Sequence, residues 1–441
     1  MTAGIRTDRV GARLERALLA FAAAWLFVLP TNAATFVRSV GFAASGVLAL
    51  AVLMRSRRAD AAPIPFSGPA ILVPLALWAA WSWLSLVWSI DRRYSLDQLE
   101  TEVAYSLLVM LIFHVAARDA AAVRTLFAVA LASLGVLAAL AVAMEIAWGT
   151  WIPYRFHYGV GAWSTWLVLA APLLVCLVAP PPLGFGGGKS ALAVGALLLA
   201  LVLATARLTG NRMVWIALAI TLAVMIAAAA LRWQRRVSRR PVLIALALIA
   251  LMGTFAVGFV DSVVERATIA YQGEESPEAT LANDPRIALW EDVAHRVAER
   301  PWTGYGFGRR ILARQLTSEL DNPMLVHAHN LFASQALQTG LPGLAFFTAM
   351  LAALVLRFVR YLRSRDDMLA LAGLIGLAVV VGFVVKSQTD DFLYRSNAKE
   401  FWALSAILLG FGCRRERDLS AGAAPVAAPS PTPPRTRPES A

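Results

Sequence analysis

The sequence has few charged residues for its length. Only 15% of its 441 residues are charged, 59% are hydrophobic, and the mean hydropathy is +0.64. Because so little polar surface cannot cover a water-soluble protein of this size, a soluble globular protein is excluded. Cysteine is also scarce, since Cys176 and Cys413 are the two in the chain. The first lies in an apolar run and the second at the end of another, which excludes a disulfide framework and a cysteine metal cluster.

Long apolar runs recur from residue 16 to residue 413. A bilayer core about 30 Å thick needs roughly 20 apolar residues for each helical crossing. The runs are rich in Ala, Leu and Val and do not alternate with polar residues, which excludes a membrane β-barrel. We therefore predict an all-α polytopic membrane protein with 12 transmembrane helices. They are expected at 16–34, 36–54, 69–90, 101–117, 123–147, 159–180, 191–208, 213–231, 241–260, 341–360, 368–387 and 398–413.

These crossings divide the chain into four predicted parts. Residues 1–260 hold the first nine crossings, 261–340 form a partly helical outer loop, and 341–413 hold the last three crossings. Residues 414–441 are rich in Ala, Pro, Ser and Thr, and we expect them to be a disordered tail.

Basic residues are distributed unevenly between the two sides of this topology. Of the 40 Lys and Arg, 24 fall in the termini and the connections on one side, which leaves 40 − 24 = 16 on the other. Seven of those 16 lie in the long segment 261–327, to which the rule for short connections does not apply. Without that segment, one side carries 24 basic residues and the other carries 9. The positive-inside rule then predicts cytoplasmic termini and a periplasmic loop. The net charge of +12 therefore reflects proximity to anionic membrane lipids, and no nucleic-acid partner is implied.

Three arginines stand at the starts or ends of predicted helices on the outer side. Arg207 and Arg212 flank the turn Thr209-Gly210-Asn211, and Arg286 follows Asp284 and Pro285, which suit the start of an amphipathic helix. A cation in the first turn of a helix is disfavoured by the helix dipole, and a bound phosphate reverses that sign. These arginines are thus candidate phosphate ligands, with simple snorkelling toward lipid headgroups as the alternative.

The segment His327-Ala328-His329-Asn330 precedes a further apolar helix that is expected to dip into the membrane before the tenth crossing. A helix start keeps a nearby histidine neutral, as a general base requires, so His329 is the candidate base. Within a helix His327 and His329 would point about 200° apart, so a shared role requires extended backbone. An ordinary interfacial histidine is the alternative to the base.

Other groups on the outer side have competing interpretations. A metal could be held by His327, His329 and the pair Asp390 and Asp391, but the ligand spacing matches no known pattern and we predict no metal. The glycine run at 304–308 is expected to form a plain turn, although its backbone could cradle a phosphate.

Two further cations and four tryptophans complete the outer face. Lys386 and Arg395 are expected at its edge. The tryptophans are predicted to form an interfacial belt and not a sugar platform, and they are Trp148, Trp151, Trp163 and Trp166.

Residues 207–345 contain three stretches that form a recognisable pattern, namely TGNRMVW, RIALW with PWTGYGFG, and HNLFASQALQTGLPG. Taken together, these stretches resemble the O-antigen ligase and polymerase superfamily. The resemblance implies a GT-C-like fold and transfer of a glycan from undecaprenyl pyrophosphate at the periplasmic face of the inner membrane, without a metal or other cofactor. His329 matches the family histidine, and Arg212 and Arg286 match its pyrophosphate-binding arginines, with Arg207 placed beside them. His327, Asn330, Lys386 and Arg395 are secondary candidates.

Within this superfamily a ligase is favoured. It would move undecaprenyl-pyrophosphate-linked O-antigen onto lipid A–core oligosaccharide with inversion at the anomeric carbon, using His329 as base and the arginines to stabilise the departing pyrophosphate. The alternatives are an O-antigen polymerase, a protein O-oligosaccharyltransferase, or, from another class, a flippase for lipid-linked oligosaccharides. A flippase needs polar groups along a path open to both sides, whereas the distinctive groups here cluster on one.

Overall fold

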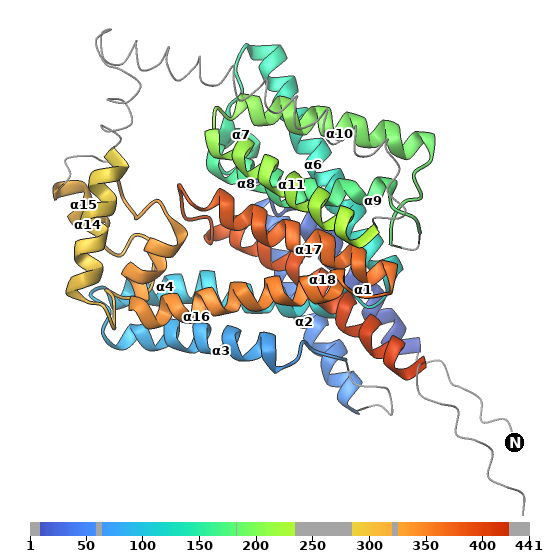
Figure 1. Ribbon diagram of the computed structural model, residues 1–441, viewed down its shortest axis with the longest axis horizontal. Coiled ribbons are helices and arrows are strands. Elements are labelled where there is room, and N and C mark those ends of the chain that lie inside the picture. Colours follow the sequence, from blue (N-terminus) through green and yellow to red (C-terminus); the bar gives the residue numbers. More distant parts are fainter. Residues whose placement is uncertain (1–8, 59–63, 182, 234–284, 320–324, 423–441) are drawn as a thin grey trace, which may run out of the picture.

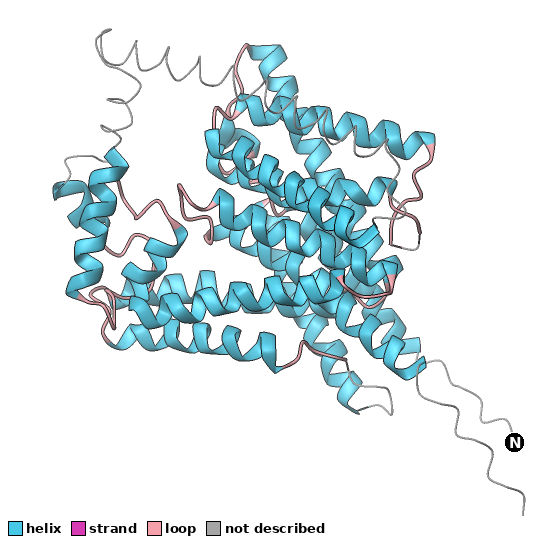
Figure 2. Cartoon of the chain, in the orientation of Figure 1, coloured by secondary structure: helices cyan, strands magenta, loops and turns pink. Residues whose placement is uncertain are grey.

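The computed structural model describes residues 9–58, 64–181, 183–233, 285–319 and 325–422. Within these ranges the chain forms helices and loops and no strand, apart from an isolated bridge between Thr31 and His157 (Figure 2). The longer helices are α1 (Arg9–Val28), α2 (Thr35–Arg58), α3 (Pro69–Leu84), α5 (Tyr105–Ala116), α6 (Ala120–Trp148), α8 (Val160–Ala170), α10 (Lys189–Leu208), α11 (Arg212–Trp233), α14 (Pro285–Glu299), α16 (Leu331–Leu362), α17 (Asp367–Lys386) and α18 (Arg395–Gly422). The shorter ones are η1 (Ser85–Val87), α4 (Arg92–Gln98), η2 (Leu99–Ala104), α7 (Pro153–Phe156), η3 (Ala171–Leu174), α9 (Val175–Val178) and α15 (Ala313–Glu319).

Among the described residues, nine helices are long and apolar enough to cross a membrane. The all-α polytopic class is therefore confirmed. The predicted first and twelfth crossings lie in α1 and α18, which are not among the nine because charged residues occupy one end of each helix. The predicted ninth crossing, 241–260, lies outside the described residues, so the total of 12 stays a prediction.

The bundle has two chemically different ends, and antiparallel packing identifies them. Arg232 in the last turn of α11 contacts Asp367 in the first turn of α17 at 3.0 Å, so the opposite tips of these two packed helices, Arg212 and Lys386, share an end. The amide of Leu331 donates to Ser387 O at 3.0 Å and brings the start of α16 to the same place. We call this the histidine end, because His327 and His329 precede α16.

The opposite end carries ion pairs between helices. Arg357 contacts Glu416 at 2.9 Å, Arg415 contacts Asp366 at 2.5 Å, and Arg118 contacts Glu15 at 3.0 Å. The pairs that involve Arg415 and Glu416 belong to α18, which continues to Gly422. A disordered tail was expected to begin at residue 414, but residues 414–422 are the last two turns of α18. The ion pairs of Arg415 and Glu416 stabilise these turns.

Two helices stand across the histidine end. In Figure 1 α14 runs across the direction of α16 and α17, with α15 beside it. Leu289 and Val293 of α14 are buried against Tyr305, Ile311 and Leu316 in a small core separate from that of the bundle. The predicted amphipathic helix before Pro301 is thus confirmed, and its apolar stripe serves mainly for packing.

Helix α16 is interrupted at Gly340, which has φ 70° and ψ −177°. A Cβ at this position would lie 2.6 Å from the carbonyl carbon of Trp302, so a larger residue would clash with the loop docked there. The amide of Leu341 donates to Pro301 O at 2.7 Å across the break. This break separates the expected apolar helix after Asn330 from the tenth crossing.

The tryptophan belt was only partly predicted. Trp148 is exposed, whereas Trp163 and Trp166 are buried inside α8, with 1% and 0% of their surface exposed. Trp151 is also buried, with 7% of its surface exposed. The belt prediction was therefore wrong for these three, and for Trp163 and Trp166 the reason is that α8 packs against α17 and α18.

Candidate functional site

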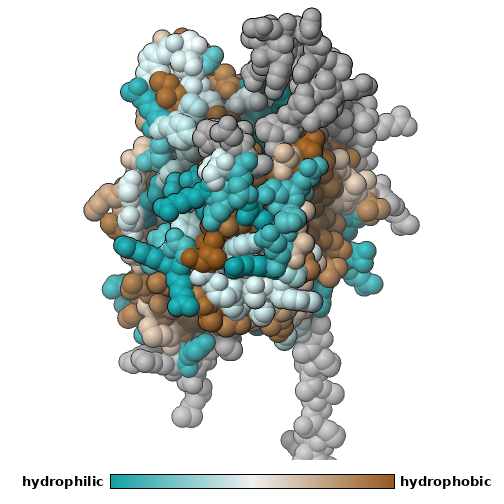
Figure 3. All heavy atoms as spheres, turned by 90° about the vertical axis from the view of Figure 1, so that its left-hand side faces the viewer, coloured by the Kyte–Doolittle hydropathy of each residue, from teal (hydrophilic) through white to brown (hydrophobic). Residues whose placement is uncertain are grey.

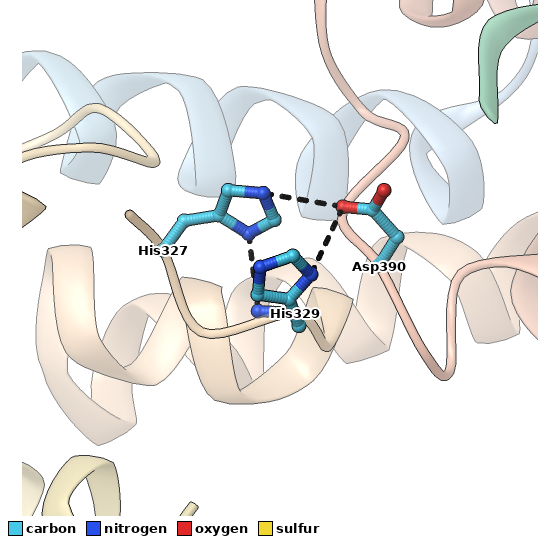
Figure 4. Close-up of side chains that lie close together, drawn as sticks. All are labelled: His327, His329 and Asp390. Carbon is cyan, nitrogen blue, oxygen red and sulfur yellow. Dashed lines mark hydrogen bonds and ion pairs between the residues drawn. The ribbon is translucent and has the colours of Figure 1, made fainter. Parts of the chain in front are cut away.

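His327 and His329 lie together at the histidine end, immediately before α16. Their rings stack with centroids 3.8 Å apart and an interplanar angle of 27°. Figure 4 shows both rings directed toward Asp390, which comes from the loop between α17 and α18. Asp390 Oδ1 lies 3.4 Å from His327 Nε2 and 3.9 Å from His329 Nδ1. The two histidines therefore share one carboxylate oxygen.

The backbone around His329 explains how two histidines with a spacing of two can meet. His329 has φ 48°, a left-handed conformation that is uncommon outside glycine, and its amide donates to His327 Nδ1 at 3.1 Å. Asn330 then caps α16 by accepting from the amides of Phe332 and Ala333 at 3.0 Å. The expected helix start is confirmed, and the non-helical turn before it removes the 200° separation.

Asn330 also fixes this turn to the neighbouring loop. Its Nδ2 donates to Gln388 O at 3.0 Å. The secondary role expected for Asn330 is thus one of positioning, because it joins the histidine segment to the segment that carries Asp390.

Arg309 crosses the same space from the loop that follows the glycine run. Its Nη1 donates to Asp391 O at 2.5 Å, and its Nη2 lies 3.4 Å from Asp390 Oδ1 and against Nε2 of His327. Its guanidinium also covers the ring of Tyr394, 4.7 Å from the centroid. Arg309 therefore connects three segments that are distant in the sequence.

Burial and charge keep His327 neutral. Burial, followed by the positive charge of Arg309, holds the pKa of His327 far below its usual range. Nδ1 of the ring accepts the amide of His329, and Nε2 faces both the Arg309 guanidinium, which can only donate, and Asp390. His327 is 3% exposed, whereas the side chain of His329 is 18% exposed. His329 is thus the more accessible of the two.

The metal interpretation has a geometric basis, since ligand atoms of His327, His329 and Asp390 lie within 4.8 Å of one another. Arg309 occupies the position that would suit a cation, because it contacts both His327 Nε2 and Asp390. His327 Nε2 could bind a metal only if Nδ1 carried the proton, and Nδ1 already accepts an amide hydrogen. These residues therefore fit a guanidinium better than a metal ion.

Helix α14 supports the histidine segment and carries Arg286. Trp290 donates from Nε1 to Ala328 O at 3.0 Å, between the two histidines. Arg286 is one helical turn earlier on the same side of α14, and its charge acts on both His327 and Lys386. The structure thus brings Arg286 to the site. Asp284, its expected capping residue, lies outside the described residues.

Arg207 and Arg212 lie at the histidine end, on either side of the turn between α10 and α11. The turn between α10 and α11 has the expected form, because Asn211 Oδ1 accepts from the amide of Met213 at 3.0 Å. Asn211 also donates to Ser164 Oγ at 3.2 Å, which fixes the turn to α8. Both arginines are exposed beside this turn. Their approach to a phosphate remains a prediction.

Lys386 and Arg395 were expected at the edge of the site, and the structure separates them. Lys386 is 1% exposed, and its Nζ lies 4.0 Å from the centroid of the Phe392 ring. Asp390 and Arg286 act on it electrostatically. Lys386 is therefore inside the site and not at its edge. Arg395, with φ 51°, begins α18 and faces a separate cavity.

The glycine run forms the expected turn and not a phosphate cradle. The amides of Tyr305 and Gly306 donate to Leu337 O and Gln338 O at 3.0 and 2.9 Å, and the amide of Gly308 donates to Gln338 Oε1 at 2.7 Å. A Cβ on Gly304 would lie 2.6 Å from the carbonyl carbon of Gln338. These glycines allow the loop to approach α16 closely and so place Arg309.

Arg309 was not among the residues predicted for the site. Asp390 was considered there only as a metal ligand, and it contacts Arg309 as well as both histidines. The local signal for Arg309 is its position directly after the glycine run, but its partners come from distant segments. Figure 3, which looks onto this end of the bundle, shows hydrophilic residues gathered over it and hydrophobic residues along the sides.

Comparison with known proteins agrees with the sequence motifs. Residues 196–348 match a family model described as O-antigen ligase, which supports membership of the O-antigen ligase and polymerase superfamily. The matched range includes Arg207, Arg212, Arg286 and the histidine segment. No curated protein matches the chain.

Proposed function

We propose that this chain, a member of the O-antigen ligase and polymerase superfamily, transfers O-antigen from undecaprenyl pyrophosphate to lipid A–core oligosaccharide. The observation that carries the proposal is the placement of His329 beside Asp390 and near Arg286 at one end of a membrane bundle. A base oriented by a carboxylate, next to cations, suits the displacement of a pyrophosphate.

His329 acts as the general base. It takes the proton of the attacking hydroxyl, whose oxygen forms the new bond to the anomeric carbon. The bond between that carbon and the pyrophosphate oxygen breaks, and its electron pair leaves with undecaprenyl pyrophosphate. Asp390, 3.9 Å from His329 Nδ1, orients the ring and stabilises the imidazolium that forms. A single displacement of this kind inverts the anomeric carbon.

Cations stabilise the leaving group. Arg286 lies in the first turn of α14 and Arg212 is the first residue of α11, where helix amides and a guanidinium fork can hold the same phosphate. Arg207, in the last turn of α10, lies across the Thr209–Asn211 turn from Arg212. Lys386, which is buried at the same end, interacts electrostatically with Asp390. The fixed positive groups lower the energy of the departing pyrophosphate in a low-dielectric site.

The charge distribution supports a periplasmic site in the inner membrane. The end opposite the histidines carries the interhelical ion pairs made by arginines. It is also the side on which the short connections are rich in arginine. By the positive-inside rule that end is cytoplasmic, together with both termini. The histidine end then faces the periplasm, where donor and acceptor lipids are both accessible from the bilayer.

Transfer by the purified protein tests this function. Lipid-linked O-antigen and lipid A–core are incubated with the unmutated chain, without ATP and with EDTA. His329→Ala and Arg286→Ala are compared with His295→Ala, a control on α14 whose side chain is 76% exposed. We expect transfer by the unmutated chain and the control, and a loss of at least about 100-fold in both variants.

Two results would overturn the proposal. If His329→Ala were as active as His295→Ala, His329 would not be the base. Complete inhibition by EDTA would indicate a mechanism that needs a metal. Extension of a second lipid-linked glycan, with no product on lipid A–core, would identify an O-antigen polymerase instead.

A further inference from the structure

A second polar cavity lies at the histidine end, on the side of the bundle formed by α2, α5 and α18. Its volume is about 380 Å³, within the range of small-ligand sites. Charged groups of both signs line it, namely Arg38, Asp97, Glu102, Arg395 and Lys399. Lys399 and Glu102 interact electrostatically across it, and the backbone amide of Arg395 donates to Glu102 Oε2 at 2.8 Å.

Aromatic rings form much of the remaining wall. Tyr105, Tyr158 and Tyr394 line the cavity, and the guanidinium of Arg38 lies 4.9 Å from the centroid of the Tyr158 ring. Aromatic faces bind the C–H faces of a sugar ring, while carboxylates and guanidinium groups bind its hydroxyls through charge-assisted hydrogen bonds. This combination suits a saccharide better than a lipid chain or an isolated phosphate.

Two of the lining residues carry polar atoms that lack partners among the described residues. They are the hydroxyl of Tyr158 and Oε1 of Gln98, and Gln98 is only 7% exposed. Buried polar atoms in proteins nearly always have a hydrogen-bond partner. One atom can donate and the other can accept, so together they match a ligand rich in hydroxyl groups.

The cavity adjoins the histidine site through Tyr394. One wall of the cavity is this ring, and Arg309, which contacts His327 and Asp390, lies 4.7 Å from its centroid. Helix α11, which carries Arg212, packs on α17, α17 packs on α18, and α18 packs on α5. The loop that carries Asp390 joins α17, the helix packed on α11, to α18, whose first residues line the cavity.

We propose that this cavity binds a sugar residue of the acceptor oligosaccharide. The inference rests on the proposed function, in which Arg212 and Arg286 hold the leaving pyrophosphate. In a single displacement the attacking oxygen and the leaving oxygen lie on opposite sides of the anomeric carbon. The acceptor therefore belongs on the side of Asp390 away from Arg212, which is where the cavity lies.

Variants of two lining residues test the proposal. Tyr158→Phe removes the hydroxyl alone, and Tyr154→Phe, at a tyrosine 73% exposed outside the cavity, is its control. Ser39→Trp places a large side chain at the exposed rim, with Ser39→Ala as its control. Transfer is measured as a function of donor and acceptor concentration.

The expected result is a rise in the KM for lipid A–core of about fivefold for Tyr158→Phe and more than about tenfold for Ser39→Trp. The KM for the donor and the values for both controls should be unchanged. An unchanged KM for the acceptor in both variants, or a rise in the KM for the donor alone, overturns the proposal.

A direct binding measurement separates this inference from the proposed function. Binding of the deacylated core oligosaccharide is measured by equilibrium dialysis against the unmutated chain and Ser39→Trp, without donor. Weaker binding by Ser39→Trp supports the cavity even if no transfer is detected. Equal binding by the two proteins overturns it even if transfer is normal.

Discussion

Arg309 donates a hydrogen bond from Nη1 to the backbone carbonyl of Asp391 at 2.5 Å. This bond joins the loop after the glycine run to the loop between α17 and α18. Asp391 is 2% exposed, and burial raises the pKa of its carboxyl. The fixed charge of Arg309 opposes this rise, so it compensates for carboxylates placed in a site shielded from water.

Replacement of Arg309 should therefore damage the site without removing a group that reacts. We expect Arg309→Gln to lower kcat by about 10- to 100-fold, because Asp390 loses its cation and the two loops lose their link. Arg309→Lys should recover only part of this loss, since an ammonium cannot contact Asp391 O and Asp390 as a planar fork does. Transfer assays should give normal rates for Arg310→Gln, whose side chain is exposed. Equal rates for all three variants would exclude this role.

His327 should make the stability of the folded protein depend on pH. Its pKa is far below the usual range in the folded state, whereas an unfolded histidine binds a proton near pH 6.5. Below that pH the unfolded chain binds a proton that the folded chain does not, so stability falls as pH falls, by up to about 1.4 kcal/mol per pH unit. His327→Gln should reduce this slope in unfolding measurements between about pH 7.5 and 5. Parallel stability curves for the two proteins would contradict the prediction.

The bond from Trp290 to Ala328 O should control how well the histidines are held. We expect Trp290→Phe to cost about 1 kcal/mol and to lower kcat several-fold, because one hydrogen bond is lost next to His329. Trp302→Phe provides the control, since its side chain is 70% exposed. Thermal unfolding and transfer rates together test this prediction, and equal effects of the two substitutions would show that the bond has no positioning role.

Two glycines with positive φ differ both in steric clash and in backbone strain. Gly340 has φ 70° and ψ −177°, a region adopted essentially by glycine alone, and a Cβ there would meet Trp302 at 2.6 Å. Gly149 has φ 68° and ψ 6°, in the left-handed region, and a Cβ there would meet nothing within 4 Å. Gly149→Ala should cost only the backbone term, about 1 kcal/mol. Gly340→Ala should cost at least about 3 kcal/mol, because the loop carrying Arg309 must move away from α16. Unfolding curves of the two variants give the comparison, and equal losses of stability would refute it.

Local sequence patterns predicted most of the helices because each crossing needs a continuous apolar run. The run expected to begin at residue 69 is α3, which begins at Pro69. The turn at Asn211 and the start of a helix next to Asn330 were also predicted, since both depend on neighbours in the sequence. The burial of Trp163 could not be predicted, because hydropathy does not distinguish a lipid-facing surface from one that packs against other helices.

The site was predicted only where its residues act locally. His329 and Arg286 were identified from helix starts, but the role of Arg309 depends on where the loop at 301–308 docks on α16. That contact joins residues about 30 positions apart and has no periodic signature. The contact between Asp390 and Arg309 was not predicted for the same reason, since the two residues come from different loops.

Helix α14 carries both Arg286 and Trp290, one turn apart. If Arg286 holds the pyrophosphate as proposed, donor binding fixes the helix that also fixes the histidine segment. The reaction should then have a compulsory order, in which the donor enters first and the acceptor binds productively only afterwards.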